Sequence, residues 1–119
     1  MATPTVLVPS PDRSVYWALG DSGAIFRSID GKSWQQQDSG VKARLLAGQA
    51  PSNTVCWVVG QQGTILLTTD GAHWERIRSP TTADIISVTA KSPDVADIVA
   101  ADGSRFSTFD RGSNWTPTD

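Results

Sequence analysis

The chain has 119 residues, of which 39% are apolar and 18% are charged, and its formal net charge is −2. This composition excludes a disordered chain, and no apolar run approaches the roughly 20 residues that a membrane-spanning helix needs. Charges of opposite sign are interspersed along the chain, which argues against a nucleic-acid partner because phosphates call for clustered Lys and Arg.

The single cysteine, Cys56, excludes an intrachain disulfide and a cysteine-based metal site. It lies in the apolar segment TVCWVV, so we interpret it as a small core residue. The first residues of the chain have none of the features of a signal peptide. The sequence therefore leaves the cellular compartment unknown.

The first unit of the chain begins with a short strand at VLV (6–8) and ends with SWQQQ (33–37). Between them, GDSG (20–23) is too short for a dinucleotide-binding loop and predicts a tight β-turn. Short apolar runs separated by such turns indicate strands rather than helices.

The second unit shows this pattern most clearly, because turn residues bound each of its apolar runs. Its second run is continuous, as in a strand buried on both faces, whereas its last run alternates apolar and charged residues like an exposed edge strand. No window has the apolar spacing of a helix. The four expected strands are RLLAGQA (44–50), TVCWVVG (54–60), TILLTT (64–69) and HWERIR (73–78).

The third unit runs from DIISVT (84–89) to NWTPT (114–118) and has drifted from the other two. A shift of 40 residues aligns the first unit with the second, and another shift of 40 reaches the third. Asp97 stands where Trp17 and Trp57 stand, and one extra residue delays the last tryptophan of the third unit to position 115.

Four short antiparallel strands in every 40 residues are typical of a β-propeller blade. We therefore predict an all-β fold, a β-propeller made of three four-stranded antiparallel blades. The blades are expected at about residues 5–38, 44–79 and 84–118, which makes residues 1–119 a single half-propeller domain.

One turn recurs in all three units, as S-x-D-G-x-x-W (28–34), T-x-D-G-x-x-W (68–74) and T-x-D-x-G-x-x-W (108–115). These motifs resemble the Asp-box, or BNR repeat, of sialidases and sortilins. Together with the preceding G-x-x-G-x-I, they are similar to the repeat of the photosystem II assembly factor (Ycf48-like) family of propellers. The stretch VCWVVGQQGTILLTTDGAHW (55–74) also resembles the C-terminal domains of bacterial anti-sigma-factor-like membrane proteins.

The resemblance implies a structural role for the turn, and the chemistry of its residues agrees. The aspartate can accept backbone N–H groups two or three residues on, the glycine can supply a positive φ, and the tryptophan is expected to lie across its own blade. Each turn offers one carboxylate, whereas Ca²⁺ needs six or more oxygens, so no metal or cofactor is expected. The structural residues are Ser28, Asp30, Gly31, Trp34, Thr68, Asp70, Gly71, Trp74, Thr108, Asp110, Gly112 and Trp115.

A catalytic site has little support in the sequence, and we predict that the protein is not an enzyme. The only histidine, His73, is expected to face solvent, and the only tyrosine, Tyr16, is expected to be buried between blades. The alternative is a glycosidase or lyase that uses carboxylates at the central channel. Asp21, Asp84 and Asp102 are the candidates, and the sequence does not fix their separation.

Three blades are too few for a closed ring, because propellers have about four to eight. The outer faces of the first and third blades are both expected to carry the apolar side chains that stack between blades, and such faces favour assembly. Two copies placed head to tail would close a six-bladed ring, so we predict a homodimer. In the alternative interpretation, the chain is a fragment of a longer propeller.

We expect a binding or scaffold module whose ligand is a peptide, a protein or a glycan. A rim of turns and blade links is the candidate binding surface. The resemblance to anti-sigma-like proteins implies the sensor or interaction domain of a larger bacterial protein, extracytoplasmic or periplasmic, with no direct membrane insertion. A purely oligomerising module is another alternative. The rim residues are Asp21, Arg44, Gln61, Gln62, Asp84 and Asp102.

Overall fold

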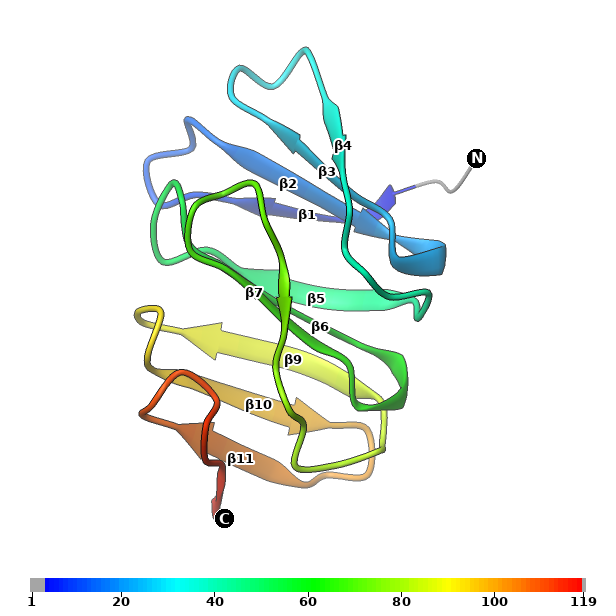
Figure 1. The fold of residues 1–119 in the computed structure, drawn as a ribbon, viewed down its shortest axis with the longest axis vertical. Helices are drawn as coiled ribbons and strands as arrows, with labels where there is room; N and C mark the ends of the chain where they lie inside the picture. Colours follow the sequence, from blue (N-terminus) through cyan, green and yellow to red (C-terminus); the bar gives the residue numbers. More distant parts are fainter. Residues whose placement is uncertain (1–3, 119) are drawn as a thin grey trace.

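The computed structural model describes residues 4–118, which form three four-stranded antiparallel sheets and so confirm the predicted fold class. Figure 1 shows the sheets stacked in chain order along the long axis of the molecule. In each sheet the strands follow one another as a meander. Within residues 4–118, no helix is long and apolar enough to span a membrane.

We call the three sheets blades one, two and three. Blade one contains β1 (Pro4–Pro9), β2 (Tyr16–Gly20), β3 (Ile25–Ser28) and β4 (Gln35–Gln37). Blade two contains β5 (Leu45–Gln49), β6 (Cys56–Gly60), β7 (Ile65–Thr68) and β8 (Glu75–Arg76). Blade three contains β9 (Ile85–Ala90), β10 (Ala96–Ala100), β11 (Arg105–Thr108) and β12 (Thr116–Thr118). The first strand of blade two, β5, contacts both β1 and β9, so the first strands run side by side through the stack.

The apolar side chains gather at the two seams between neighbouring blades. In blade two, Cys56, Val58 and Leu66 pack against blade one, whereas Trp57 and Leu67 pack against blade three, and all five are buried. A strand covered on both faces has no solvent side, which explains the continuous apolar run of β6. Burial also raises the pKa of the Cys56 thiol far above its ordinary value, as expected for an inert core cysteine.

Two fully buried tryptophans, 40 residues apart in the sequence, fill these seams. Trp57 Nε1 donates a hydrogen bond of 3.1 Å to the carbonyl oxygen of Ser92, which ties blade two to the first loop of blade three. The Arg27 guanidinium carbon lies 5.4 Å from the centroid of the Trp17 ring, within the range of a cation–π contact. Within the described residues, Trp17 Nε1 has no hydrogen-bond partner.

Single 3-10 turns connect the second and third strands of blades one and two. They are η1 (Asp21–Gly23) and η2 (Gln61–Gly63), and both lie on the right-hand side of the stack in Figure 1. The sequence predicted tight β-turns here. The structure confirms them, because the Ala24 N–H donates to the Asp21 carbonyl oxygen and the Thr64 N–H to that of Gln61. The middle residues Ser22 and Gln62 have left-handed φ values of 58° and 59°, and the glycine after each also has a positive φ, as in a type I′ turn.

The outer face of blade one is apolar. The side chains of Leu7 and Ile29 are 59% and 71% exposed, and Phe26 is half-buried on the same sheet. Tyr16 lies on this face and is half-buried, so within one chain it is not covered by a second blade as the sequence predicted. No other blade of this chain covers its side of the sheet, because blade one is the first in the stack.

The outer face of blade three is polar at its centre, which corrects in part the expectation of two apolar end faces. Val99 alternates outwards with Asp97, and Phe109, the counterpart of Ile29, is 71% exposed. Ile98 packs in the seam with blade two, so the alternation of a strand turns its neighbour Asp97 outwards. There Ser107 donates a hydrogen bond to the Asp97 carboxylate, and the flanking residues Thr89 and Thr116 are exposed. Blade three thus ends the stack with a mixed face, in which Asp97 occupies the position that a tryptophan holds in the other two blades.

Two glycines with positive φ give a matched test of how closely the chain packs. A side chain at Gly63 (φ +70°) would overlap the carbonyl oxygen of Thr81 in the link to blade three, whereas one at Gly103 (φ +90°) would meet nothing within 4 Å. We expect Gly103→Ala to lower the free energy of unfolding by about 1–2 kcal/mol through backbone strain alone. Gly63→Ala should cost clearly more, measured by urea denaturation. Equal losses would show that the link is free to move away.

Candidate functional site

We call residues 28–34, 68–74 and 108–115 the motif turns, and each joins the third and fourth strands of its blade. In blade two, Asp70 Oδ1 accepts the N–H groups of Ala72 and His73, both at 2.8 Å. The buried Thr68 hydroxyl donates to the same oxygen at 3.1 Å and accepts the N–H of Gly71 at 3.0 Å. Two short side chains thus hold the whole turn.

The motif turns of blades one and three are closed in the same way. Asp30 Oδ1 accepts two backbone N–H groups at 2.8 and 2.9 Å, and Asp110 Oδ1 accepts one at 2.9 Å. In both blades the hydroxyl at the first motif position accepts the N–H of the motif glycine. The extra residue of blade three, Arg111, adopts a φ of 63°, which lets the longer turn close on the same partners.

These hydrogen bonds lower the pKa of all three motif carboxylates. For Asp30 and Asp70 the largest cause is the backbone N–H three residues on, and for Asp110 it is the side-chain amide of Asn114. A hydrogen bond donated to a carboxylate stabilises its charged form. At neutral pH these groups therefore act as fixed acceptors within their own turns.

The motif tryptophans of blades two and three pack across a seam onto the preceding blade, and not across their own blade as the sequence predicted. Trp74 Nε1 donates to Gln37 Oε1 on β4 at 2.7 Å. Trp115 Nε1 donates to the carbonyl oxygen of Arg78 at 3.0 Å, and its ring meets that of Trp57 edge-on, with centroids 6.1 Å apart. Each of these two motif turns therefore joins two blades.

Trp34, the motif tryptophan of blade one, has no preceding blade in this chain, and it is 39% exposed. In blade two, Gln37 of the preceding blade accepts from Trp74 and also donates to the carbonyl oxygen of Gly71 at 2.7 Å, so that motif turn is held at two points. The difference in exposure follows from position in the stack, since the motifs themselves match.

Four of the predicted rim residues lie in pairs at the seams. Arg44 Nε is 3.0 Å from Asp21 Oδ1, an ion pair between η1 and the start of blade two. The backbone N–H of Gln62 donates to Asp84 Oδ1 at 2.9 Å, which links η2 to the start of blade three. Both side chains of the ion pair are about half exposed, so it contributes little to stability. The pairs mark where neighbouring blades are joined.

The other two rim residues are held separately. The backbone N–H of Gln61 donates to the carbonyl oxygen of Arg44 at 2.9 Å, again at the first seam. Asp102 accepts the N–H of Ser104 at 2.9 Å within its own turn. The three candidate catalytic carboxylates are thus bound to different partners at three places along the rim.

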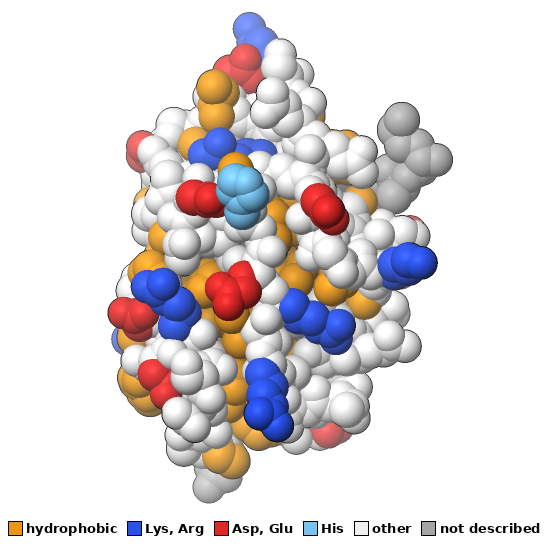
Figure 2. Space-filling model, viewed as in Figure 1, with side chains coloured by type: hydrophobic (Ala, Val, Ile, Leu, Met, Phe, Trp, Pro, Cys, Tyr) orange, Lys and Arg blue, Asp and Glu red, His pale blue; other side chains and the backbone are white. Residues whose placement is uncertain are grey.

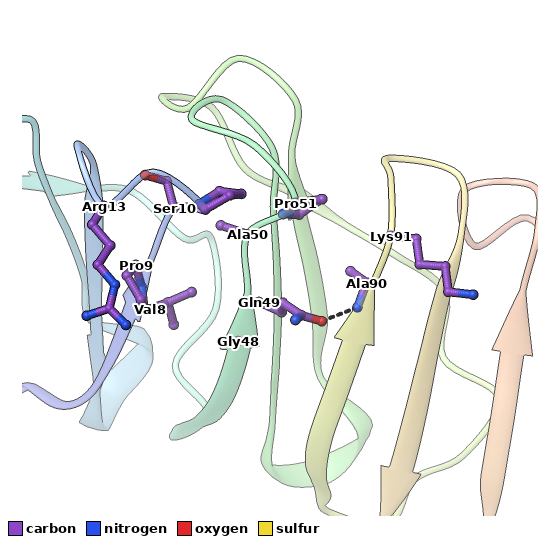
Figure 3. A pocket seen from close by; sticks show the side chains of 11 residues that line it. Val8, Pro9, Ser10, Arg13, Gly48, Gln49, Ala50, Pro51, Ala90 and Lys91 are labelled. Atoms are coloured by element: carbon purple, nitrogen blue, oxygen red, sulfur yellow. Dashed lines mark hydrogen bonds between the residues drawn. The ribbon is translucent and has the colours of Figure 1, made fainter.

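A cleft of about 560 Å³ opens on the other side of the stack, where the first strands β1, β5 and β9 end. Figure 3 shows its lining side chains, which come from all three blades. Gln49 Oε1 accepts a hydrogen bond from the N–H of Ala90 and so joins blades two and three along the cleft. Two lining side chains, Arg13 and Lys91, are cationic, and none of the lining residues is acidic.

Sequence reasoning missed this cleft because no single stretch encodes it. A signal was present in the repeat. Ser10, Ala50 and Ala90 are 40 residues apart, all three are buried, and all three line the cleft at the end of a first strand. Small residues that recur where a strand ends indicate a place where neighbouring blades leave room.

The chain's only histidine lies on the surface, as the pale blue side chain in Figure 2 shows. The side chain of His73 is 89% exposed, and its Nδ1 is 2.7 Å from Asp70 Oδ2 within the motif turn. Acidic and basic side chains are scattered over the same face. Among residues 4–118, no group of three or more His, Cys, Asp or Glu side chains is placed to hold a metal ion.

Three stacked four-stranded blades with a recurring motif turn define a partial β-propeller of the BNR type. The sequence profile described as "Photosynthesis system II assembly factor YCF48" matches residues 10–118, and the chain belongs to that family. No curated protein sequence matches the chain.

Two solved structures of similar fold are each more than twice as long as this chain. One, described as YCF48 bound to D1 peptide, is 23% identical with a TM-score of 0.80, over 98% of this chain and 39% of that one. The other, YCF48 from Cyanidioschyzon merolae, is 28% identical with a TM-score of 0.80, over 97% of this chain and 40% of that one. The chain therefore spans about two fifths of the length of these relatives.

The buried hydroxyl of a motif turn gives a test of its contribution to stability. Thr68→Ala removes the acceptor for the Gly71 N–H and the donor to Asp70. We expect the free energy of unfolding to fall by about 1–3 kcal/mol, the range for an unsatisfied buried group. Thr54→Ala, at an exposed loop position, is the control and should stay within about 0.5 kcal/mol of the wild type. Similar values for the two variants would contradict a structural role for the turn.

Proposed function

We propose that the protein is a non-catalytic binding and scaffold module that binds an extended peptide segment of a partner at the three-blade cleft. The observation that carries the proposal is the cleft itself, which the first strands of all three blades build together. Family membership and the solved relative described as bound to a D1 peptide support a peptide as the ligand class.

The chemistry of the cleft suits the acidic part of a peptide. Its walls are strand ends with small and proline side chains, so a ligand can approach the backbone closely. Lys91 is exposed at the end of β9, and it can pair with a carboxylate of the ligand. The positive side chains of the cleft have no acidic neighbour among its lining residues to compete for them.

An enzyme is the alternative, and the positions of the carboxylates give it no support. A glycosidase needs two carboxyl groups that face one another across a bond of the substrate. Asp21 is paired with Arg44, Asp84 accepts the N–H of Gln62, and Asp102 caps its own turn. Family members as a class support a binding role.

Assembly into a dimeric six-bladed ring remains part of the proposal. The exposed apolar face of blade one and the unpartnered Trp34 support assembly, because equivalent faces of blades two and three are covered by a preceding blade. A purely oligomerising role is the alternative to ligand binding. The sensor role in a larger bacterial protein, and its extracytoplasmic location, rest on the sequence resemblance alone.

Charge reversal in the cleft tests peptide binding. Fluorescein-labelled hexaglutamate and hexalysine peptides are the probes, and fluorescence anisotropy of the full chain gives their affinities. We expect hexaglutamate to bind more tightly than hexalysine, and Lys91→Glu to weaken its binding about tenfold through loss of a charge-assisted hydrogen bond. Lys42→Glu, in the exposed link between blades one and two, is the matched control and should bind like the wild type. Equal losses in the two variants would refute the cleft as the site.

Solution mass tests the ring. Sedimentation equilibrium of the full chain should show association to twice the monomer mass of 12.7 kDa. The association should depend on concentration, because the blade-three face at each contact between copies is partly polar. A single species of 12.7 kDa at every concentration up to the millimolar range would remove the ring from the proposal.

A further inference from the structure

We infer that the outer faces of blades one and three are complementary in size and charge, so that blade three of one copy packs on blade one of a second copy. The inference rests on the dimeric ring proposed above, and it assigns the contact residues. Its basis is a comparison with the two seams within the chain, between blades one and two and between blades two and three. The same repeat positions face one another at both seams.

The second strand of each blade presents neighbouring positions to opposite sides. Trp17 and Trp57 face the following blade, and each shares a core cluster with a small residue of that blade, Cys56 and Ala96 respectively. At both internal seams one cluster thus combines a large side chain of one blade with a small one of the next, as dense packing favours.

On the two outer faces of the stack, the large and the small side chain have exchanged positions. Asp97 stands at the position of Trp17 and Trp57, so blade three offers a small side chain. Tyr16 stands at the position of Cys56 and Ala96, so blade one offers a large one. The small and the large residue compensate each other only where these two faces meet.

A second pair of positions repeats the inversion. On the third strands, Ser107 of blade three replaces Arg27 of blade one, as the pairing of each residue with the second strand shows. On the first strands, Leu7 occupies the register position that Gly48 occupies in blade two. A side chain at Gly48 would crowd Val8 at 2.9 Å in the internal seam, whereas Leu7 stands 59% exposed at the open end.

One pair of opposite charges also lies where the two faces would meet. At the internal seams, side chains of the second and third strands form hydrogen bonds with the first loop of the following blade. Trp57 Nε1 donates to the carbonyl oxygen of Ser92, and an Arg27 N–H donates to that of Asn53 at 3.0 Å. In blade one, 40 residues before Asn53, this loop carries the exposed Arg13. By this equivalence the Ser107 position of one copy reaches Arg13 of the other, and the Asp97 position reaches the neighbouring Asp12. Ser10 and Ser14 donate to the Asp12 carboxylate within its own loop, and Ser107 donates to the Asp97 carboxylate. We therefore place the Asp97 carboxylate next to Ser107, within reach of the Arg13 guanidinium of the other copy.

A hollow of about 420 Å³ on the outer face of blade one marks the unfilled contact. Its lining includes Arg13, Tyr16, Gly31 and Trp34. In blade two the motif glycine is covered by a side chain of the preceding blade, but Gly31 meets only Tyr16 of its own blade, 3.8 Å away.

The second copy also offers a partner for Trp34. In blade two, Trp74 donates to Gln37 of the preceding blade. In blade three, Thr118 holds the register position of Gln37, since each pairs with the first residue of its third strand. The Thr118 hydroxyl is therefore the acceptor for Trp34 across the contact between copies.

A charge swap in the full chain tests the contact. Arg13→Asp and Asp97→Arg each place like charges at the contact, so each should weaken the dimer at least tenfold in sedimentation equilibrium. The double variant restores opposite charges and should return to within about threefold of the wild type. Aspartate tolerates the left-handed φ of 61° at position 13, and Glu75→Arg, an exposed charge reversal on β8, is the control that should dimerise normally.

A size swap gives an independent readout if the charge variants lose their fold by circular dichroism. Asp97→Trp copies the internal repeats and should weaken the dimer, because the new ring meets Tyr16. Adding Tyr16→Ala should restore it. Dimerisation of the wild type with no effect of either swap would overturn this contact and leave the dimer standing. A wild type that is monomeric at all concentrations would overturn the dimer itself, and this contact with it.

Discussion

Each blade of this protein is a four-stranded sheet that must be covered on its apolar faces, and the contact between neighbouring blades is the interaction on which the structure depends. A sheet with two apolar faces is unstable in water unless both faces are buried. Here each blade covers a face of its neighbour, and Trp17 and Trp57 fill the two seams. Trp74 and Trp115 each donate a hydrogen bond to the preceding blade. In blades two and three the motif turn thus holds its own hairpin and also joins its blade to the preceding sheet.

Because the motif turns and the seams hold the fold together, other parts of the surface are free to bind a ligand. The residues held most firmly, such as Asp70 and Thr68, use their hydrogen-bonding capacity inside the turn and offer little to a ligand. The side of the stack where the first strands end is different, because small residues leave a cleft there and Lys91 extends its charge into solvent. The peptide site proposed above therefore lies in a gap between blades, and the seams determine its shape.

Much of the fold could be predicted from the sequence, because a 40-residue repeat with four apolar runs in each copy is typical of a propeller and of few other folds. The direction in which the motif tryptophans point could not, since periodicity shows which residues are equivalent but not which neighbour they touch. The polarity of blade three was visible as Asp97 in place of a tryptophan, but only the pairing of β10 with its neighbours shows that this residue faces outwards. The cleft is lined by segments far apart in the sequence, and Asp21 pairs with Arg44 of the next blade, so no local sequence pattern could predict either feature.

Small-angle X-ray scattering of the full chain tests most directly whether a second copy covers the exposed face of blade one. A single stack has a Cα radius of gyration of 13.1 Å. A compact particle of twice the chain length should have a radius of gyration of about 17–18 Å. Closure by a second copy predicts the larger value at high concentration. A value that stays near 13.1 Å at every concentration would contradict it.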